Sequence, residues 1–357
     1  MNRYAGNVSP ADMWDSLALT DSPVVLYGTG NGADKIIDEL DRRGISVAGV
    51  FASSGFVRDR SFRGYKVRSY EECRELFPGM KVLMCFGSSR PEVLENVKRI
   101  MSECDFYVPD VPVYGDNIFD SAFYEAHREE LEAVRSALAD EKSVKTFDGV
   151  VAYKLSGRPE RLFECETAEE EADGLIKLPD NASIADFGAY NGDTVKKYAL
   201  LYPSYSSITA VEPDKRNYAK LCANTADMRN IISLNALLSD ENGDSHIEKA
   251  KGRGVHESEN GAFVSKVTVD GLFAEHGVDF MKFDVEGAEL AALKGAVRTI
   301  KKYRPSMLIS CYHRSEDIFT LPLELLSVCP EYKLYLRHLP GLPAWDTQFY
   351  AVCPDKK

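Results

Sequence analysis

Two short stretches of the chain combine carboxylates with glycine directly after apolar, strand-like segments. One is 284–289 (DVEGAE), which follows the apolar segment 278–283, and the other is 187–194 (FGAYNGDT), which follows 183–186. In an open α/β sheet, the turns that join strands to helices lie at the carboxyl edge, where ligands bind. Two such turns, with a carboxylate-ended strand between them, predict an enzyme that binds a nucleoside-containing ligand.

The turn that begins at Asp186 has the pattern D-x-G-x-x-x-G. Gly188 would let the chain leave the strand sharply, and Gly192 would let the backbone approach a ligand closely. The small Ala189 keeps the floor of the turn low. The N–H groups at the start of the following helix suit an anionic group such as a carboxylate.

Glu212 ends the next predicted strand, 24 positions after Gly188. A carboxylate there can accept hydrogen bonds from both hydroxyls of a ribose, as the acidic residue of dinucleotide-binding folds does. Pro213 and Asp214 then begin another helix. The plain alternative is an ordinary strand–helix–strand unit in which Asp214 is only a helix cap, and these two features alone do not decide between the readings.

A functional role for Asp284 depends on which strand lies beside its own. If the strand that ends at Asp284 lies beside the strand that ends at Asp186, both turns face one crevice and Asp284 lies at the reacting end of the ligand. Glu286 falls in the first turn of the following helix, where the helix dipole favours a carboxylate in any case. A structural and a catalytic role are therefore both open for Glu286.

Two histidines, His313 and His338, end the strands that come next in the chain. Both should emerge at the same sheet edge, where an imidazole could take a proton from a substrate hydroxyl at neutral pH. Each could equally be a polar strand-end residue. Together with Asp284 they could in principle hold a metal, but their spacing is not diagnostic, and no metal is assigned.

The elements that would position these residues alternate regularly after residue 183. Strands are predicted near 183–187, 207–212, 230–238, 279–284, 306–312, 332–338 and 347–353. No helical pattern separates the last two strands, so they should pair antiparallel. The polar, glycine-rich segment 242–261 is interpreted as a hairpin or a mobile loop.

An earlier alternation indicates a smaller parallel-sheet unit, with strands at 23–27, 46–51 and 81–87 and helices at 34–43 and 91–102. The turn Gly28-x-Gly30-x-x-Ala33 matches the dinucleotide-binding fingerprint. The confirming acid is missing, because the second strand ends in the residues FASS at 51–54, and NAD binding is therefore disfavoured. A pocket for a phosphate or a sugar nucleotide, and a unit that only packs or dimerises, both stay open.

We place a domain boundary between residues 117 and 118. Residues 1–117 are expected to form a Rossmann-like α/β domain, and residues 118–357 a second, larger one. The charged segment from 118 to about 142 has a helical period and predicts one connecting helix that belongs to the second domain. The acidic run between 164 and 171 is interpreted as the solvated face of a helix.

Composition excludes several classes of function. A hydrophobic content of 44% supports a buried core, and a formal net charge of -13 disfavours nucleic-acid partners. No apolar run approaches the roughly 20 residues of a spanning helix, and no leader pattern opens the chain, so we expect a soluble, cytoplasmic protein. Eight cysteines without a C-x-x-C pair predict reduced thiols, and a homo-oligomer stays open.

In these residues the chain resembles the FkbM-type S-adenosylmethionine-dependent methyltransferases, over about 118–352. The likeness is most specific in DFGAYNGDT at 186–194, VEP at 211–213 and MKFDVEGAE at 281–289, with LKGA at 293–296 and YH at 312–313 as further family-like positions. The resemblance implies a seven-stranded Rossmann-like sheet with its last strand antiparallel. It also implies O-methylation, typically of a hydroxyl on a sugar or a polyketide-like product.

The resemblance further implies that Gly188, Asn191 and Gly192 line the amino-acid end of the cofactor, that Glu212 holds its ribose, and that 235–239 borders the adenine. The residues expected to bind the cofactor are Asp186, Gly188, Ala189, Tyr190, Asn191, Gly192, Glu212, Leu238 and Ser239. The residues expected to act in catalysis are Asp284, Glu286, His313 and His338.

We therefore expect an S-adenosyl-L-methionine-dependent O-methyltransferase that acts on a hydroxyl of a small molecule or glycan. The chain has no Asn/Asp-Pro-Pro-Tyr segment after the fourth strand of the second domain, which would have indicated methylation of an amine. Two other classes stay open. One is a nucleotide- or sugar-nucleotide-dependent enzyme led by the N-terminal turn, and the other is a catalytically silent module that binds the cofactor.

Overall fold

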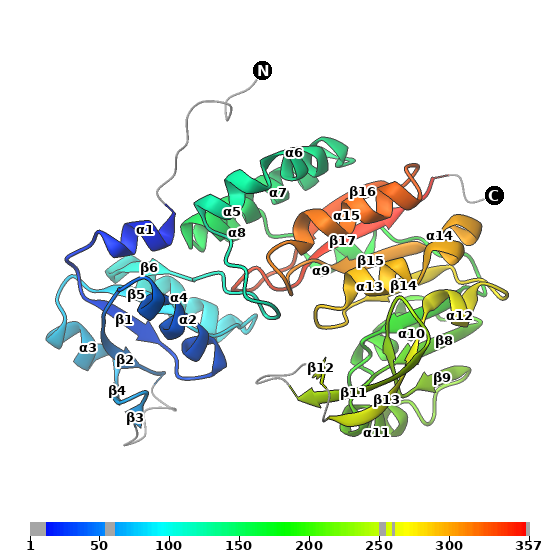
Figure 1. Cartoon of the computed structure of the whole chain (residues 1–357), viewed down its shortest axis with the longest axis horizontal. Helices are drawn as coiled ribbons and strands as arrows, with labels where there is room; N and C mark the ends of the chain where they lie inside the picture. The colour runs from blue at the N-terminus through cyan, green and yellow to red at the C-terminus, as the bar shows by residue number, and fades with distance from the viewer. Residues whose placement is uncertain (1–11, 54–60, 250–254, 259–260, 355–357) are drawn as a thin grey trace.

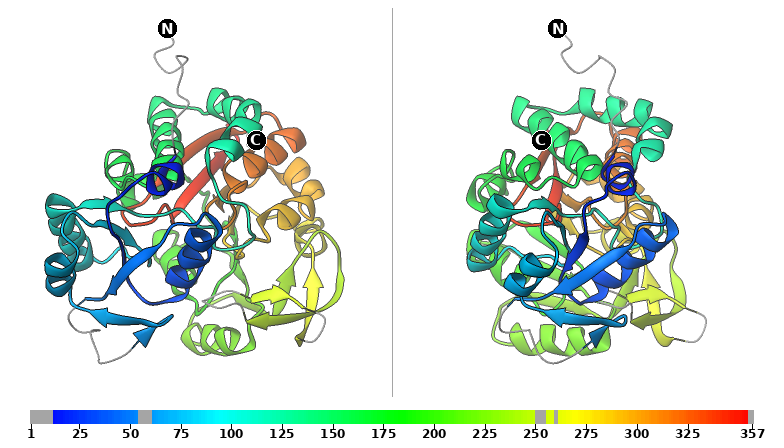
Figure 2. Two further views of the ribbon diagram at one scale, coloured as in Figure 1. Left: turned by 60° about the vertical axis from the view of Figure 1, so that its left-hand side comes forward. Right: turned by 90° about the vertical axis from the view of Figure 1, so that its left-hand side faces the viewer.

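The computed structural model describes residues 12–53, 61–249, 255–258 and 261–354 of the 357. Residues 1–11, Ser54 and part of the predicted loop at 242–261 lie outside these ranges. Two parallel-rich sheets lie side by side, joined by a group of helices drawn above them (Figure 1). Figure 2 shows the same arrangement from two further directions. The α/β class predicted from the sequence is confirmed.

The N-terminal sheet has the strand order β3-β4-β2-β1-β5-β6. Its strands are β1 (Val24–Tyr27), β2 (Val47–Phe51), β3 (Ser61–Phe62), β4 (Tyr65–Arg68), β5 (Lys81–Met84) and β6 (Asp105–Tyr107). Its helices are α1 (Met13–Ala18), α2 (Asn31–Arg42), α3 (Tyr70–Leu76) and α4 (Pro91–Glu103). The predicted strands β1, β2 and β5 pair in parallel, while β3, β4 and β6 widen the sheet beyond the prediction.

The prediction of a single connecting helix at 118–142 is wrong. The chain instead forms α5 (Ser121–Ala126), α6 (Arg128–Ala137) and α7 (Glu141–Ser156). Leu138 is extended, and the next residue donates its backbone N–H to the carbonyl of Leu334 at 2.8 Å. Asp140 then caps α7 by accepting from the N–H of Ser143 at 2.7 Å. Docking onto the larger sheet therefore interrupts the helical pattern.

The acidic run that follows α7 is exposed for the most part. It begins just after α8 (Glu160–Phe163) and runs into α9 (Glu169–Asp173), and the three glutamates in the first turn of α9 face solvent. This agrees with the predicted solvated face.

The larger sheet has seven strands in the order β16-β17-β15-β14-β7-β8-β9. They are β7 (Ser183–Phe187), β8 (Ser207–Val211), β9 (Ile231–Leu234), β14 (Phe280–Phe283), β15 (Ser306–Ser310), β16 (Lys333–His338) and β17 (Thr347–Val352). Only the last strand, β17, runs antiparallel to its neighbours. The helices that cover the sheet are α10 (Asp193–Leu201), α11 (Lys215–Asn224), α12 (Val269–Phe273), α13 (Glu289–Lys294), α14 (Val297–Tyr303) and α15 (Asp317–Val328). The antiparallel last strand matches the expectation. The single strand predicted at 230–238 is wrong, because the chain divides there into β9 and a short strand, Ala236–Leu238, that lies in another sheet.

The central pair of the larger sheet is β7 and β14. They run in parallel register, with Asp186 opposite Lys282. Strand β8 lies on the other side of β7 and continues the sheet toward β9, so the connections diverge at β7. This switch point brings the two glycine-containing turns to one edge, as predicted.

A separate small sheet follows β9. Its strands are β10 (Ala236–Leu238), β11 (Gly243–Lys249), β12 (Val255–Glu257) and β13 (Ala262–Val267), in the order β10-β13-β11-β12. Strands β11 and β12 form the hairpin predicted within 242–261. The sequence pattern did not indicate that this hairpin joins a four-stranded sheet.

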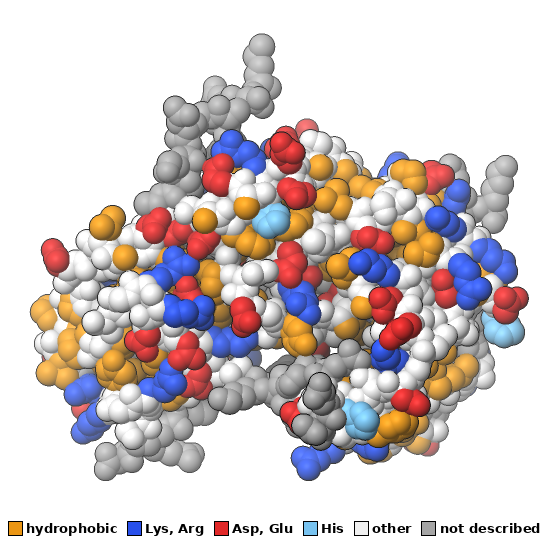
Figure 3. All heavy atoms as spheres, in the orientation of Figure 1, with side chains coloured by type: hydrophobic (Ala, Val, Ile, Leu, Met, Phe, Trp, Pro, Cys, Tyr) orange, Lys and Arg blue, Asp and Glu red, His pale blue; other side chains and the backbone are white. Residues whose placement is uncertain are grey.

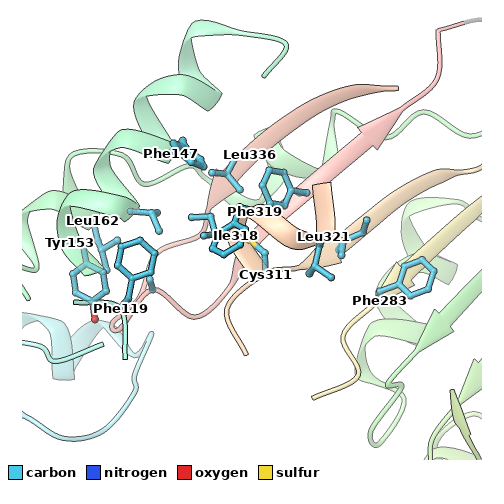
Figure 4. Packing of buried hydrophobic residues seen from close by; sticks show 14 of the residues in the cluster. Phe119, Phe147, Tyr153, Leu162, Phe283, Cys311, Ile318, Phe319, Leu321 and Leu336 are labelled. Atoms are coloured by element: carbon cyan, nitrogen blue, oxygen red, sulfur yellow. The ribbon is translucent and has the colours of Figure 1, made fainter. Parts of the chain in front are cut away.

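One continuous hydrophobic core joins the two halves of the molecule. In Figure 4, side chains from the part of the chain between the two sheets pack toward side chains of α15 and β16; they are Phe119, Phe147, Tyr153 and Leu162. All eight cysteines are free thiols, as expected. Among the described residues, no helix has the length and apolar character needed to cross a membrane.

Candidate functional site

The turn after β7 is shaped by glycine. Gly188 and Gly192 have φ angles of 80° and 86°, in the left-handed region that suits residues without a side chain. A Cβ on Gly188 would lie 1.8 Å from the carbonyl oxygen of Asp284. The predicted sharp exit from the strand is therefore confirmed, and it lets the two turns of the switch point touch.

A buried lysine links those two turns. Lys282 of β14 is 4% exposed, and its ammonium lies 3.1 Å from Asp186 and 3.5 Å from Asp284. It also donates to the carbonyl of Gly188 at 3.3 Å. Asp186 is fully buried and accepts a second hydrogen bond from Thr194. Asp186 thus organises the turn from below, so any part it has in cofactor binding is through the turn.

Glu212 is a second buried carboxylate at this edge. It is 6% exposed, and its two oxygens accept backbone N–H groups from Tyr190 at 3.0 Å and Asp214 at 2.9 Å. Burial raises the pKa of Glu212 to about 7. Each carboxylate oxygen has a second lone pair, so the group can still accept from two hydroxyls.

The remaining residues predicted to bind the cofactor surround Glu212 and the glycine turn. Tyr190 is partly exposed, at 36%, and has a φ of 46°. Asn191 caps its own loop, since its side chain accepts from the N–H of Asp193 at 3.2 Å. Ala189 is fully buried in the apolar cluster beneath the turn.

The segment predicted to border the adenine lies beside this group. Asn235 donates to the carbonyls of Glu212 and Pro213, each at 2.9 Å. Leu238 and Ser239 follow in and just after β10, both buried, and the N–H of Ser239 donates to Val267 at 3.0 Å. The segment 235–239 therefore meets the end of β8 at the same sheet edge.

Three of the four predicted catalytic residues meet at the end of β14. His313 Nε2 lies 3.6 Å from Asp284 and 3.7 Å from Glu286. The hydroxyl of Tyr312 donates to Asp284 at 3.1 Å. Asp284 and Glu286 keep 29% and 37% of their side chains exposed, whereas His313 is 1% exposed. The carboxylates are therefore open to a ligand and the imidazole lies behind them.

The charges in this cluster depend on one another. Burial alone would lower the pKa of His313. The nearby carboxylates of Glu289, Asp284 and Glu286 have the larger, opposite effect, and together they raise the pKa from 6.5 to about 10. Burial raises the pKa of Asp284, but Lys282 and His313 together bring it below its usual value. The carboxylates around His313 therefore favour its protonated form in the cofactor-free protein, where the sequence suggested an imidazole ready to take a proton.

His338 does not join this group. It ends β16, three strands from β14 in the sheet order, which corresponds to roughly 14 Å across the strands. It is fully buried, its Nδ1 lies 3.1 Å from the hydroxyl of Thr347, and burial lowers its pKa to about 4. A neutral imidazole enclosed in this way is a packing residue.

Asp284, Glu289 and His313 are also the one group of described residues whose donor atoms could surround a metal, since those atoms lie within 4.8 Å of one another. The donors already have partners. Glu289 accepts the N–H groups of Val285 and Gly287, and Asp284 faces the ammonium of Lys282. His313 in turn lies 2.9 Å from Glu289 through its Nδ1, so each of the three side chains already has a partner within the protein.

The segment before residue 118 reaches the same cluster. Tyr114 donates its backbone N–H to the carbonyl of His313 at 2.8 Å, and a Cβ on Gly287 would lie 2.9 Å from the Tyr114 side chain. Arg314 donates to the carbonyl of Gly287 at 2.9 Å and lies 4.3 Å from the centre of the Tyr114 ring. Sequence reasoning missed Tyr114, Lys282 and Glu289. A lysine within an apolar strand was the one available signal.

Among the described residues, the glycine turn of the N-terminal sheet lacks a carboxylate at the place that Glu212 takes in the larger sheet. Strand β2 ends at Phe51, and the described residues after it, Ala52 and Ser53, carry no carboxylate. The hydroxyl of Ser53 is instead 2.7 Å from that of Tyr27.

On the face shown in Figure 3, basic and acidic side chains are interspersed, and no large basic patch is seen there.

Comparison with known proteins agrees with this geometry. Residues 186–334 match the family model described as the methyltransferase FkbM domain. The structure is similar to that of methyltransferase FkbM from Methylobacillus flagellatus KT, with a TM-score of 0.73 and 21% identity over 96% of this chain and 93% of that chain. At this identity the match shows a shared fold, which includes the N-terminal sheet. No curated protein sequence matches.

Other solved methyltransferase structures match about half of the chain. Fibrillarin from Aeropyrum pernix, solved with natively bound S-adenosyl-L-methionine, has 18% identity over 51% of this chain and 72% of its own, with a TM-score of 0.34. The family match covers the glycine turn, Glu212 and the cluster at the end of β14. Residues 186–334 of this chain are therefore similar to the methyltransferase FkbM domain.

Proposed function

We propose that this protein transfers a methyl group from S-adenosyl-L-methionine to a hydroxyl oxygen of a small molecule or glycan. The observation that carries the proposal is the meeting of Asp284, Glu286 and His313 at the end of β14, directly beside the glycine turn. A cofactor turn in contact with a cluster of proton-carrying groups is what transfer to a hydroxyl requires.

The residues at the switch point fit this cofactor. The turn of Gly188 and Gly192 would hold its amino-acid end, with Tyr190 and Asn191 beside it. Glu212 has acceptor capacity beyond its two backbone contacts, which suits the two ribose hydroxyls. Segment 235–239, with Leu238 and Ser239, would border the adenine, while Asp186 and Ala189 support the turn from beneath.

The cofactor would supply an electrophilic methyl group on a sulfonium. The chain would hold the acceptor oxygen in line with that group, and alignment of this kind can be worth on the order of 7–11 kcal/mol. Asp284 and Glu286 would receive the acceptor hydroxyl, and His313 would hold its proton. Because the neighbouring carboxylates raise the pKa of His313, the ring must lose its own proton before it can accept another. A general base at this place contributes roughly 10²–10⁴-fold.

The test uses the full chain and a labelled cofactor. Trideuteromethyl S-adenosyl-L-methionine is incubated with the protein and with extracts of small molecules and glycans, and products are followed by mass spectrometry. The proposal expects a label that resists mild alkali, as an ether does, and that is lost in His313→Asn with little change in cofactor affinity by calorimetry. Label on nitrogen would overturn the hydroxyl assignment. Cofactor binding without transfer to any acceptor would identify a silent binding module.

We also propose that residues 1–117 set the choice of acceptor, because Tyr114 packs on the catalytic turn while every proposed cofactor contact lies beyond residue 118. A chain that begins near Asn117 should bind the cofactor and change its acceptor range. The hydrophobic core crosses this boundary, so folding is checked first by circular dichroism. A folded truncation that binds no cofactor would contradict the domain division.

A further inference from the structure

Glu289 is a carboxylate with no exposure to solvent, although it lies in the first turn of α13, where most acidic residues face water. Its two oxygens accept the backbone N–H groups of Val285 at 2.8 Å and Gly287 at 3.0 Å. It therefore closes, from inside, the turn that carries Asp284 and Glu286. A helix-start charge needs no such burial, so the position of Glu289 calls for a further cause.

The further cause is His313. Glu289 Oε1 lies 2.9 Å from His313 Nδ1, and both side chains are almost completely buried. The approach departs from the ideal N–H···O line, so charge attraction contributes more than a directional hydrogen bond. With Nδ1 held at Glu289, the other ring nitrogen faces Asp284 and Glu286, on the side open to a ligand.

Several elements around the imidazole contribute a carboxylate, while Tyr312 contributes an aromatic ring whose centre lies 4.2 Å from that of the imidazole. Besides the carboxylates of the β14–α13 turn and α13, α15 provides Asp317 and the β16–β17 turn provides Asp346, both of which sense the charge of His313. Glu289 has the shortest contact of the group to His313. Removing it should therefore change the ring more than removing any of the others.

We propose that Glu289 is the positioning residue of this site: it holds Nδ1 of His313 so that, in the neutral ring, the proton stays on Nδ1 and the basic Nε2 faces the acceptor. The arrangement is the one in which a carboxylate orients a histidine that acts on a hydroxyl. The inference rests on the proposed function, because it concerns the same proton transfer.

The test needs no acceptor. Imidazole nitrogens are followed by NMR against pH in the full chain, with His313 assigned by comparison with His313→Asn. The variants are Glu289→Gln and, as a matched control, Glu171→Gln, which removes a carboxylate that is 57% exposed and paired with Lys142. We expect the pKa of wild-type His313 to lie above 8 and its neutral form to carry the proton on Nδ1. Glu289→Gln should lower this pKa by at least one unit, a tenfold loss of proton affinity, whereas the control should not.

Two results would overturn the inference. One is a folded Glu289→Gln protein in which the pKa and the tautomer of His313 are unchanged. The other, which needs no variant, is a wild-type protein whose neutral His313 carries its proton on Nε2. Glutamine cannot accept both N–H groups of the turn, so the second result decides the matter if Glu289→Gln does not fold. Calorimetry with S-adenosyl-L-methionine on the same samples reports separately on the proposed function.

Discussion

Replacing Glu212 with glutamine should have opposite effects on folding and on cofactor binding. The carboxylate is 6% exposed, and burial raises its pKa from 4.5 to about 7. An acid whose folded-state pKa is raised loses stability as the pH rises from its unfolded to its folded pKa. One pKa unit corresponds to about 1.36 kcal/mol, so ionising Glu212 costs roughly 2–3 kcal/mol of stability between pH 5 and pH 8. Glutamine carries no charge and escapes this loss.

The variant has costs of its own, and they do not depend on pH. Tyr190 and Asp214 each donate an N–H to a carboxylate oxygen, and an amide offers only one oxygen. One N–H is then left facing the amide nitrogen, which costs about 1–3 kcal/mol. The difference in stability between Glu212→Gln and wild type contains this constant at every pH, so it cancels when the difference at pH 8 is compared with that at pH 5. That difference should rise by roughly 2–3 kcal/mol from pH 5 to pH 8 in favour of the variant.

The affinity of Glu212→Gln for the cofactor, in contrast, should fall. Loss of a charged acceptor for the ribose hydroxyls costs about 1.5–3 kcal/mol, which is roughly tenfold to a hundredfold in affinity. The assays are urea denaturation of the cofactor-free protein across pH and calorimetry with S-adenosyl-L-methionine at pH 8. Glu164→Gln, at a side chain that is 64% exposed, is the control. Parallel stability profiles combined with unchanged affinity would refute the reasoning.

Three further substitutions test other parts of the account. Lys282→Met leaves Asp186 buried without its cation and should lower stability by about 3–5 kcal/mol, measured by urea denaturation, whereas an unchanged midpoint would show that the ion pair is dispensable. Gly188→Ala forces a Cβ to within 1.8 Å of the Asp284 carbonyl at a φ of 80°, so cofactor binding by calorimetry should be lost, and retained affinity would contradict the tight turn. His338→Asn should leave that affinity within twofold, because the residue lies three strands from β14, and a large loss would return His338 to the site.

Sequence pattern predicted the fold well where periodicity and strand-end chemistry agree. The glycine turn, the end of β8 at Glu212 and the β14 turn lie at one sheet edge because parallel strands must end together. The connecting helices were predicted poorly, because the extended Leu138 follows from pairing of Ala139 with Leu334, a contact nearly two hundred residues away in the chain. Local periodicity carries no information about such a partner.

The side chains of the site show the same division. Asp284 and His313 could be predicted because each ends a strand next to the switch point. His338 satisfies the same rule, yet β17 lies between its strand and β15, which His313 follows, and only the strand order reveals this. Glu289 was not singled out from the sequence, since its burial depends on a histidine that follows in the next strand–turn segment.

The most direct test of the central claim is a crystal structure of the full chain soaked with S-adenosyl-L-homocysteine. We expect density for S-adenosyl-L-homocysteine at the carboxyl edge of β7. Its amino-acid end should lie at Gly188 and Gly192, both of its ribose hydroxyls should contact Glu212, and its sulfur should point toward Asp284. Density at the glycine turn after β1, or a ribose that does not contact Glu212, would contradict this expectation.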